Sequence, residues 1–362
     1  MKHFLVFVFL FLGCEGHAYL GRSFNYPPHE NYQRLTTENF EIIFPKEYES
    51  EGHYTAEVIE QLHAKLKEVF HYQASRRVTI LLADNTDDPN GVTLVFGHAG
   101  IILFMNSPDP YDSIGEYDVW LKMLIIHEYA HYLSLDQTRG FFNFTRYLFG
   151  DVILPNQFWP SWLAEGVAVF IESYFTSQGR GHGTYYETLT RDALHRGTLG
   201  TKKFIEYNKV FGPYPEFPFG AAAYYMGFAA FDEMAREYGK DAPAKFCEEG
   251  SYRVPFFLNG TFQNIGGDDL ESLWGRWRNR EQDRMKTDLD WIKQNGTRDP
   301  EFLTREGEAV LSPRLSPDGT KLAYALDSSG HDFGGVFWMD VESRKTHRIE
   351  LARAGGQVSW SD

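Results

Sequence analysis

The sequence predicts an α+β protein, in which a part that combines strands and helices precedes a mainly helical part and a strand-rich C-terminal segment. Three observations indicate this order. Strand and helix patterns alternate over residues 38–105, helical patterns dominate residues 118–277, and short strands separated by turns return after residue 311.

The first 18 residues have the pattern of an export signal. A positively charged start precedes an uninterrupted apolar run from Phe4 to Leu12, which is too short to cross a bilayer. Residues 1–18 are therefore predicted to be a secretory signal peptide that is cleaved after Ala18, giving a periplasmic or extracellular product. The alternative is a lipoprotein that is anchored through Cys14.

Composition limits the partners and the sources of stability. The 35 basic and 50 acidic residues give a net charge of −15, which argues against binding to nucleic acid or to anionic lipid. The only cysteines are Cys14, inside the predicted signal, and Cys247. We therefore expect no intramolecular disulfide, a small buried apolar role for Cys247, and a fold that is stabilised by a core drawn from the 43% hydrophobic residues.

Elements of the first region follow from their apolar patterns. Residues 40–44 and 78–82 are predicted strands, and residues 54–70 carry an apolar stripe at helical spacing between them. Residues 100–105 form another predicted strand, and residues 92–96 a weaker one.

The segment from residue 118 to residue 135 is predicted to be a buried helix with a metal-binding motif. His127 and His131 are four residues apart, so both imidazoles leave the same face of the helix and could bind one tetrahedral metal ion. Glu128 is placed where a base would take a proton from a water on that metal. The alternative is a buried helix whose histidines only form hydrogen bonds.

A second motif supplies a third ligand. Residues 162–168, Trp-Leu-Ala-Glu-Gly-Val-Ala, begin a predicted helix after Pro160 and contain Glu165. Together with His-Glu-x-x-His upstream, this motif resembles the gluzincin metallopeptidases, the group that contains thermolysin and aminopeptidase N. The resemblance implies a thermolysin-like domain with an N-terminal α/β sheet subdomain and a C-terminal helical subdomain. It also implies one Zn²⁺ per chain, bound by His127, His131 and Glu165.

The same resemblance implies a substrate-binding strand and an oxyanion donor. In gluzincins the strand nearest the cleft lies at the sheet edge and binds extended substrate backbone, a role open here to residues 92–96 or to residues 100–105. Within the predicted helix 219–238, Tyr224 precedes Gly227 by three residues, which is similar to the aminopeptidase arrangement of a phenol that stabilises the oxyanion. Tyr225 is the alternative, and core packing is the structural explanation for either tyrosine.

Three further residues are candidates near the metal. A ligating histidine usually donates its second N–H to an acceptor, and Asp136 or Glu172 could supply one. His182 lies in a glycine-rich segment, residues 178–183, which is predicted to be a flexible loop. There it either reaches the cleft as a second electrophile or stays in solvent.

The residues together predict hydrolysis of peptide bonds. Neutral His127 and His131 with ionised Glu165 leave a fourth position for a water whose pKa zinc lowers to about 7. Glu128 would take its proton and pass it to the leaving amine. No Gly-rich acidic motif for a substrate amine precedes His127, which favours an endopeptidase acting on a peptide or protein. The alternative is an inactive gluzincin scaffold that binds partners.

The C-terminal segment has a different pattern. Residues 311–324, Leu-Ser-Pro-Arg-Leu-Ser-Pro-Asp-Gly-Thr-Lys-Leu-Ala-Tyr, predict a turn followed by a strand, and further strands are expected at residues 336–340 and 347–351. The pattern restarts at residues 358–362, at the spacing of a propeller blade. It resembles the repeats of the bacterial periplasmic Tol-associated β-propeller (a TolB-like, WD-repeat-like fold).

These patterns divide the chain into three segments. The signal peptide, residues 1–18, is followed by a gluzincin-like domain over residues 19–300 and by the first blade and the start of a second blade over residues 301–362. Because one blade cannot bury its own faces, the segment indicates either a fragment of a longer protein, which we favour, or a vestige. A complete propeller would be expected to bind cell-envelope partners.

Overall fold

The computed structural model describes most of the chain from residue 30 onward. The described residues are 30–86, 89–97, 99–108, 114–115, 117–199, 201, 205, 209–210, 212, 214, 218–296, 301–304, 309–327, 335–349 and 358–361. The predicted signal peptide, with Cys14 and Ala18, lies outside them. Within the described parts no helix is both long and apolar enough to cross a membrane.

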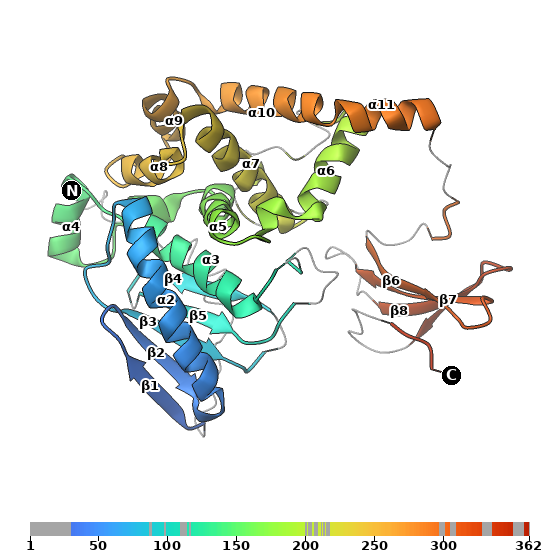
Figure 1. The fold of residues 1–362 in the computed structure, drawn as a ribbon, viewed down its shortest axis with the longest axis horizontal. Coiled ribbons are helices and arrows are strands. Elements are labelled where there is room, and N and C mark those ends of the chain that lie inside the picture. Colours follow the sequence, from blue (N-terminus) through green and yellow to red (C-terminus); the bar gives the residue numbers. More distant parts are fainter. Residues whose placement is uncertain are drawn as a thin grey trace, which may run out of the picture.

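A five-stranded mixed sheet forms the N-terminal part (Figure 1). Its strands in chain order are β1 (Tyr32–Thr36), β2 (Phe40–Pro45), β3 (Val78–Ala83), β4 (Gly91–Leu94) and β5 (Gly100–Phe104). Their spatial order is β1-β2-β3-β5-β4, with β2, β3 and β5 parallel and the two edge strands antiparallel to their neighbours. Strand β1 was not predicted, because its partly exposed polar sequence lacks a clear alternating pattern.

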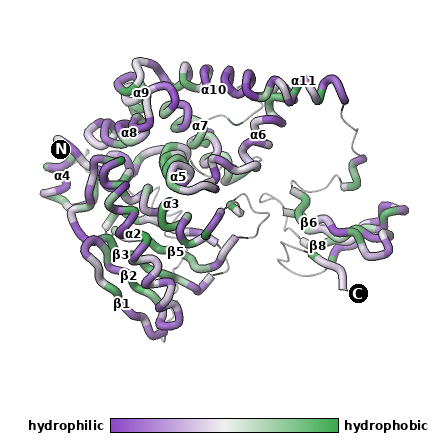
Figure 2. The backbone as a smooth tube through the Cα atoms, in the orientation of Figure 1, coloured by the Kyte–Doolittle hydropathy of each residue, from purple (hydrophilic) through white to green (hydrophobic). Residues whose placement is uncertain are grey.

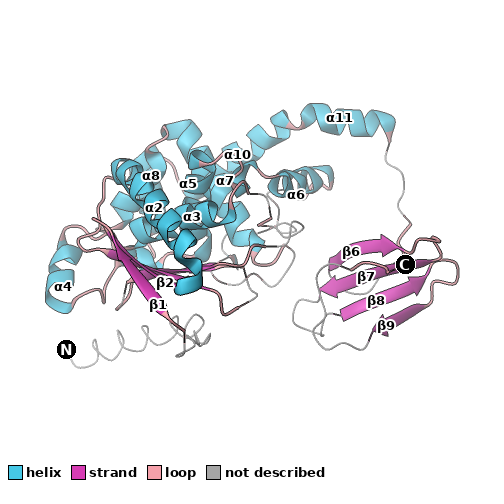
Figure 3. Ribbon diagram, turned by 60° about the horizontal axis from the view of Figure 1, so that its bottom comes forward, coloured by secondary structure: helices cyan, strands magenta, loops and turns pink. Residues whose placement is uncertain are grey.

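Helix α2 (Glu49–Phe70) packs on the sheet and begins earlier than its apolar stripe suggested. Gly52, near the start of this helix, lies against the Phe44 ring, where any side chain would collide. Helix α3 (Trp120–Leu135) is buried along nearly its whole length, as its apolar sequence predicted. Figure 3 shows the helices gathered on one side of the sheet.

The helical part follows α3. Its elements are α4 (Phe141–Phe149), η2 (Pro155–Phe158), α5 (Ser161–Phe175), η3 (Arg180–His182), α6 (Thr184–His195), α7 (Ala221–Tyr238), α8 (Ala242–Gly250), α9 (Leu258–Gly266), α10 (Leu270–Arg284) and α11 (Lys286–Asn295). One apolar core is shared by the five-stranded sheet and these helices. Figure 2 shows the matching pattern: α5 is mainly hydrophobic, whereas α10 and α11 at the surface are mainly hydrophilic.

Helices α5 and α7 cross at two glycines. A Cβ atom at Gly166 would collide with the backbone of Gly227, and one at Gly227 would collide with the carbonyl oxygen of Trp162. The two backbones can approach so closely only because neither glycine has a side chain. This crossing positions the start of α5, which carries Glu165, next to the start of α7, which carries Tyr224.

Cys247 has the role that the sequence predicted, and α4 has exposed aromatic side chains. Cys247 is fully buried in α8, where its thiol donates a hydrogen bond to the Pro243 carbonyl oxygen and burial raises its pKa, in agreement with an inert apolar role. The aromatic-rich connector after α3 contains α4, whose Phe141, Tyr147 and Phe149 side chains are exposed.

The C-terminal residues form a four-stranded antiparallel sheet. The strands β6 (Ala309–Leu315), β7 (Lys321–Asp327), β8 (Gly335–Asp340) and β9 (Thr346–Ile349) follow one another in space, and their buried side chains form a cluster separate from the main core. Strand β6 was not predicted, because Pro313 and a bulge at Ser312, whose φ is 48°, interrupt its pattern. The Trp360 indole donates to the Arg314 carbonyl oxygen, so residues 358–361 lie beside β6. The sheet has the strand arrangement of one propeller blade, whereas the propeller itself stays a prediction.

Candidate metal centre

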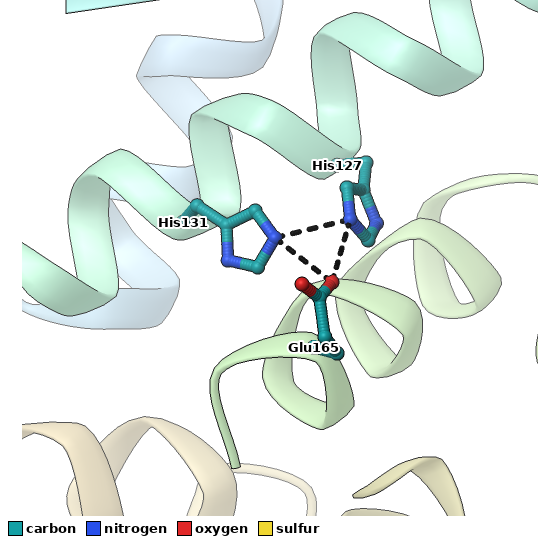
Figure 4. A group of neighbouring side chains, drawn as sticks. All are labelled: His127, His131 and Glu165. Atoms are coloured by element: carbon teal, nitrogen blue, oxygen red, sulfur yellow. Dashed lines mark hydrogen bonds and ion pairs between the residues drawn. The ribbon is translucent and has the colours of Figure 1, made fainter. Parts of the chain in front are cut away.

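Three predicted ligands meet between α3 and α5 (Figure 4). His127 Nε2 and His131 Nε2 are 3.1 Å apart, and Glu165 Oε2 lies 3.3 Å from the first and 3.2 Å from the second. His127 and His131 come from successive turns of α3, and Glu165 faces them from the first turns of α5. The two histidines are buried and Glu165 is partly buried.

These distances fit a tetrahedral zinc ion. Zinc bonds of about 2.0–2.1 Å at tetrahedral angles hold their ligand atoms about 3.3 Å apart, which is close to all three separations. In the absence of a metal ion, the acidic groups favour a proton on His127. Burial and the charge of Arg180 lower the pKa of His127, but the bonds to Glu165 and Glu172 outweigh them and raise it to about 9. The pKa of Glu165, which burial alone would raise, is lowered by His131 and His127.

Glu172 fixes the orientation of the first histidine. Its Oε2 atom lies 2.8 Å from His127 Nδ1, so one of the two predicted acceptors is in place. Burial alone would raise the Glu172 pKa, but the charge and hydrogen bonds of Arg180 outweigh it and lower the pKa to about 2. A carboxylate only accepts hydrogen bonds. The tautomer of neutral His127 with its proton on Nδ1 can donate to this carboxylate, and in that tautomer the Nε2 lone pair is directed toward the metal position.

The second predicted acceptor, Asp136, is a wrong assignment. Its carboxylate accepts hydrogen bonds from Tyr72, at 2.5 Å, and Arg146, at 2.6 Å, and it makes no bond to His131. Asp136 follows the last turn of α3, so it is directed away from the metal-binding face. His131 Nδ1 has no hydrogen-bond partner among the described residues.

Glu128 lies against the edge strand β4. Thr93 Oγ1 is 2.7 Å from Glu128 Oε2 and 2.8 Å from the Glu128 carbonyl oxygen, so the Thr93 hydroxyl can donate to either. A Cβ atom at Gly91 would lie 2.6 Å from Glu128 Oε1, so Gly91 provides the space for this side chain. Neither residue was predicted, because their contacts depend on how β4 packs across α3.

The sheet order shows which of the two candidate substrate strands lies at the edge of the sheet. Residues 100–105 correspond to β5, which pairs with β3 on one side and β4 on the other and is therefore an interior strand. Residues 92–96 overlap β4, which is the edge strand. The stronger apolar pattern therefore belonged to the interior strand, because a continuous apolar run indicates burial and not a position at the sheet edge.

One of the two candidate tyrosines lies at the centre. The Tyr224 ring stacks on the His127 ring at a centroid distance of 6.0 Å and an interplanar angle of 26°. The Tyr225 hydroxyl is instead 2.7 Å from Thr190 Oγ1, in the core beneath α6. Of these two tyrosines, Tyr224 therefore contacts a metal-binding residue, and Tyr225 is a core residue.

The segment 178–183 differs from its prediction. Its central residues form the short helix η3, and His182 Nε2 lies 2.9 Å from the Ser173 carbonyl oxygen, so His182 does not reach the metal-binding atoms. Arg180, which the sequence pattern did not indicate, is buried there against Glu172 and His127. The one sequence signal that could have indicated Arg180 is Glu172, which lies within the apolar sequence of α5. A buried carboxylate requires a cation nearby.

Comparisons with known proteins give only distant similarities. No protein-family model and no curated protein matches the sequence. The chain is similar to the structure of Legionella pneumophila aminopeptidase A in complex with aspartic acid, at 16% identity and a TM-score of 0.41, over 90% of this chain and 36% of that one. It is also similar to an aminopeptidase N family protein from Idiomarina loihiensis, at 9% identity and a TM-score of 0.34, over 90% and 67% of the two chains. The chain thus spans about a third of the length of the Legionella protein. At these TM-scores the similarity assigns neither fold nor function.

Proposed function

We propose that this protein is a zinc-dependent peptidase. The observation that carries the proposal is the group of His127, His131 and Glu165, whose ligand atoms lie at tetrahedral spacing, with Glu128 next to His127 on the same helix. A structural cluster of buried histidines would need no carboxylate base next to a sheet edge.

The metal and the base have complementary roles in this proposal. A bound zinc ion supplies Lewis acidity, which lowers the pKa of a coordinated water and polarises a carbonyl group. Glu128 takes a proton from the attacking water and returns it to the leaving amine. The hydroxyl of Thr93 restrains one Glu128 oxygen, so the other can face the water.

The edge strand β4 supports a peptide as the substrate. Its outer side can pair with an extended backbone, which gives affinity without demanding particular side chains. Because Gly91 and Thr93 of this strand contact Glu128, a peptide bound along β4 would place its scissile carbonyl near the base. Tyr224 would donate from the other side, on α7, to the oxygen that becomes negative.

Two finer features of the proposal rest on sequence patterns. The absence of a Gly-rich acidic motif before His127 favours an endopeptidase that cleaves within peptides or proteins. Export of the chain, and docking of cell-envelope proteins by a propeller that contains residues 301–362, are further proposals of this kind.

Metal content and hydrolysis of an unfolded protein test the proposal together. Wild type and Glu128→Gln should each bind one zinc, and only wild type should hydrolyse the substrate. Glu233→Gln is a matched control, because Glu233 is also a buried, bonded glutamate but pairs with Arg280 on α10 instead of the metal group. It should retain both zinc and activity.

The products and the negative outcomes are equally informative. Internal fragments in the mass spectrum would support an endopeptidase, whereas stepwise shortening from one end would favour an exopeptidase. Zinc without hydrolysis in wild type would argue against a peptidase. No zinc in wild type would refute the metal centre and favour an inactive scaffold.

A further inference from the structure

Arg180 is a buried cation directly behind the metal-binding group. Its side chain is 6% exposed, and the carboxylate of Glu172 beside it is fully buried. Three donors of Arg180 reach this carboxylate: the backbone N–H and Nε–H contact Oε1 at 2.9 and 2.8 Å, and a terminal N–H contacts Oε2 at 2.7 Å. The contact is therefore bidentate, which fixes the plane of the carboxylate as well as its position.

The turn that carries Arg180 is packed too closely for larger residues. A Cβ atom at Gly179 would collide with the backbone of Ser173, and one at Gly181 would collide with the Phe228 ring. The Gly181 N–H donates to Ser173 Oγ at 2.9 Å, which fixes the turn to α5. The glycines that suggested a flexible loop thus allow close packing against α5 and α7, and this packing inserts Arg180 into the core.

Arg180 also contacts Tyr224 and His127. Its guanidinium lies 4.6 Å from the centre of the Tyr224 ring, which in turn stacks on His127. A terminal nitrogen of Arg180 lies 2.6 Å from His127 Nδ1, and because both groups are donors when Nδ1 carries the proton, this is a packing contact and not a hydrogen bond. One side chain therefore contacts a metal ligand on α3, the acceptor for that ligand on α5 and the candidate oxyanion donor on α7.

We propose that Arg180 is a positioning residue of the metal centre, a role that rests on the proposed zinc peptidase function. By fixing both oxygens of Glu172, Arg180 directs Oε2 at His127 Nδ1 and so fixes the imidazole with Nε2 toward the metal. By its contact with the Tyr224 ring, it also sets the position of that phenol relative to the metal. Metal affinity and the contribution of Tyr224 to catalysis both depend on Arg180.

Two substitutions and a matched control test this role through zinc affinity, measured by competition with a chelator. Arg180→Gln should weaken zinc binding by about 10- to 100-fold, which is the usual effect of losing such a support. Arg180→Lys should weaken it less, because lysine keeps the charge but cannot span both oxygens. The control is Arg146→Gln, which breaks another buried arginine–carboxylate pair, with Asp136, and should lower the melting temperature without changing zinc affinity.

A second readout concerns Tyr224 and separates positioning from general destabilisation. At saturating zinc, Tyr224→Phe should lower kcat strongly in wild type and only slightly in the Arg180→Gln background, because the phenol is already displaced there. If Arg180→Gln does not fold, Arg180→Lys and Gly181→Ala serve instead, since a methyl group at residue 181 pushes the turn off Phe228.

The outcomes distinguish this role from the proposed function. If wild type binds zinc, and Arg180→Gln binds zinc as tightly as the Arg146→Gln control does, the role of Arg180 is overturned and the metal centre remains intact. Zinc binding without peptide hydrolysis would refute the peptidase, while the affinity series would still decide on Arg180. If wild type binds no zinc, both proposals fail.

Discussion

A methyl group at residue 91 would enter the space that the Glu128 side chain occupies. The Cβ atom of Gly91→Ala would lie 2.6 Å from Glu128 Cγ, 2.6 Å from Oε1 and 2.7 Å from Cδ, whereas ordinary contacts are 3.4–4 Å. Gly91 has no positive φ, so the strand itself accepts alanine. The substitution therefore displaces the candidate base without altering a metal ligand or the backbone.

The size of the effect follows from the displacement. The carboxylate must move by about 1 Å to restore normal contact, and a misplacement of that size costs about 100-fold in rate. In activation free energy this is about 3 kcal/mol. We expect kcat/KM of Gly91→Ala to fall about 100-fold, while zinc content remains one per chain because the three atoms nearest the added methyl group all belong to Glu128.

Three measurements on purified protein check this expectation: zinc content, melting temperature and the rate of peptide hydrolysis. Gly275→Ala is the control, because a Cβ atom at Gly275 in α10 meets only open space and its φ is not positive. It should match wild type in all three. Wild-type activity in Gly91→Ala would refute the contact between β4 and the base. Loss of zinc would show that β4 supports the ligands rather than Glu128.

The remaining predictions concern the phenol, the helix crossing and pH. Tyr224→Phe should lower kcat by about 10²- to 10³-fold with zinc content unchanged, as for the loss of one oxyanion donor; steady-state kinetics check this, and unchanged kcat would exclude that role. Gly227→Ala should destabilise the fold by about 1–3 kcal/mol or more, because its methyl group forces α5 and α7 apart; chemical denaturation measures this, and wild-type stability would contradict the close crossing. In chelator-treated protein, wild type should be more stable than Glu172→Gln at neutral pH. The Glu172 pKa is lowered from 4.5 to about 2 in the fold, so this advantage should be complete above pH 4.5 and disappear as pH falls toward 2. Melting curves across that range test the sign, and an advantage that grows on acidification would refute it.

The group of His127, His131 and Glu165 was predictable because each part of it lies in a short sequence motif. Helical periodicity alone places His127 and His131 on one face, and the motif around Glu165 supplied the partner through a resemblance to known proteins. The core strands β2, β3 and β5 were also predictable, because strands covered by helices form continuous apolar runs.

The residues that surround these ligands were not predictable, because their roles depend on long-range packing. Thr93 and Gly91 reach Glu128 only through the pairing of β4 with β5, and a four-residue strand gives little pattern. Arg180 lies in a segment whose glycines indicate flexibility when they are considered alone. Asp136 was misassigned, because its position beyond the last turn of α3 selects a different partner.

The crossing of α5 and α7 at Gly166 and Gly227 has a mechanical consequence. Helices in backbone contact cannot slide or rotate without collision, so Glu165 and Tyr224 belong to one rigid unit. His127 and His131 belong to α3, which packs against α5 in the main apolar core, whereas the backbone contact at the two glycines is between α5 and α7. A bound zinc would then cross-link α3 to the rigid unit of α5 and α7. Its removal should increase amide hydrogen exchange where α3 meets α5 but not where α5 meets α7.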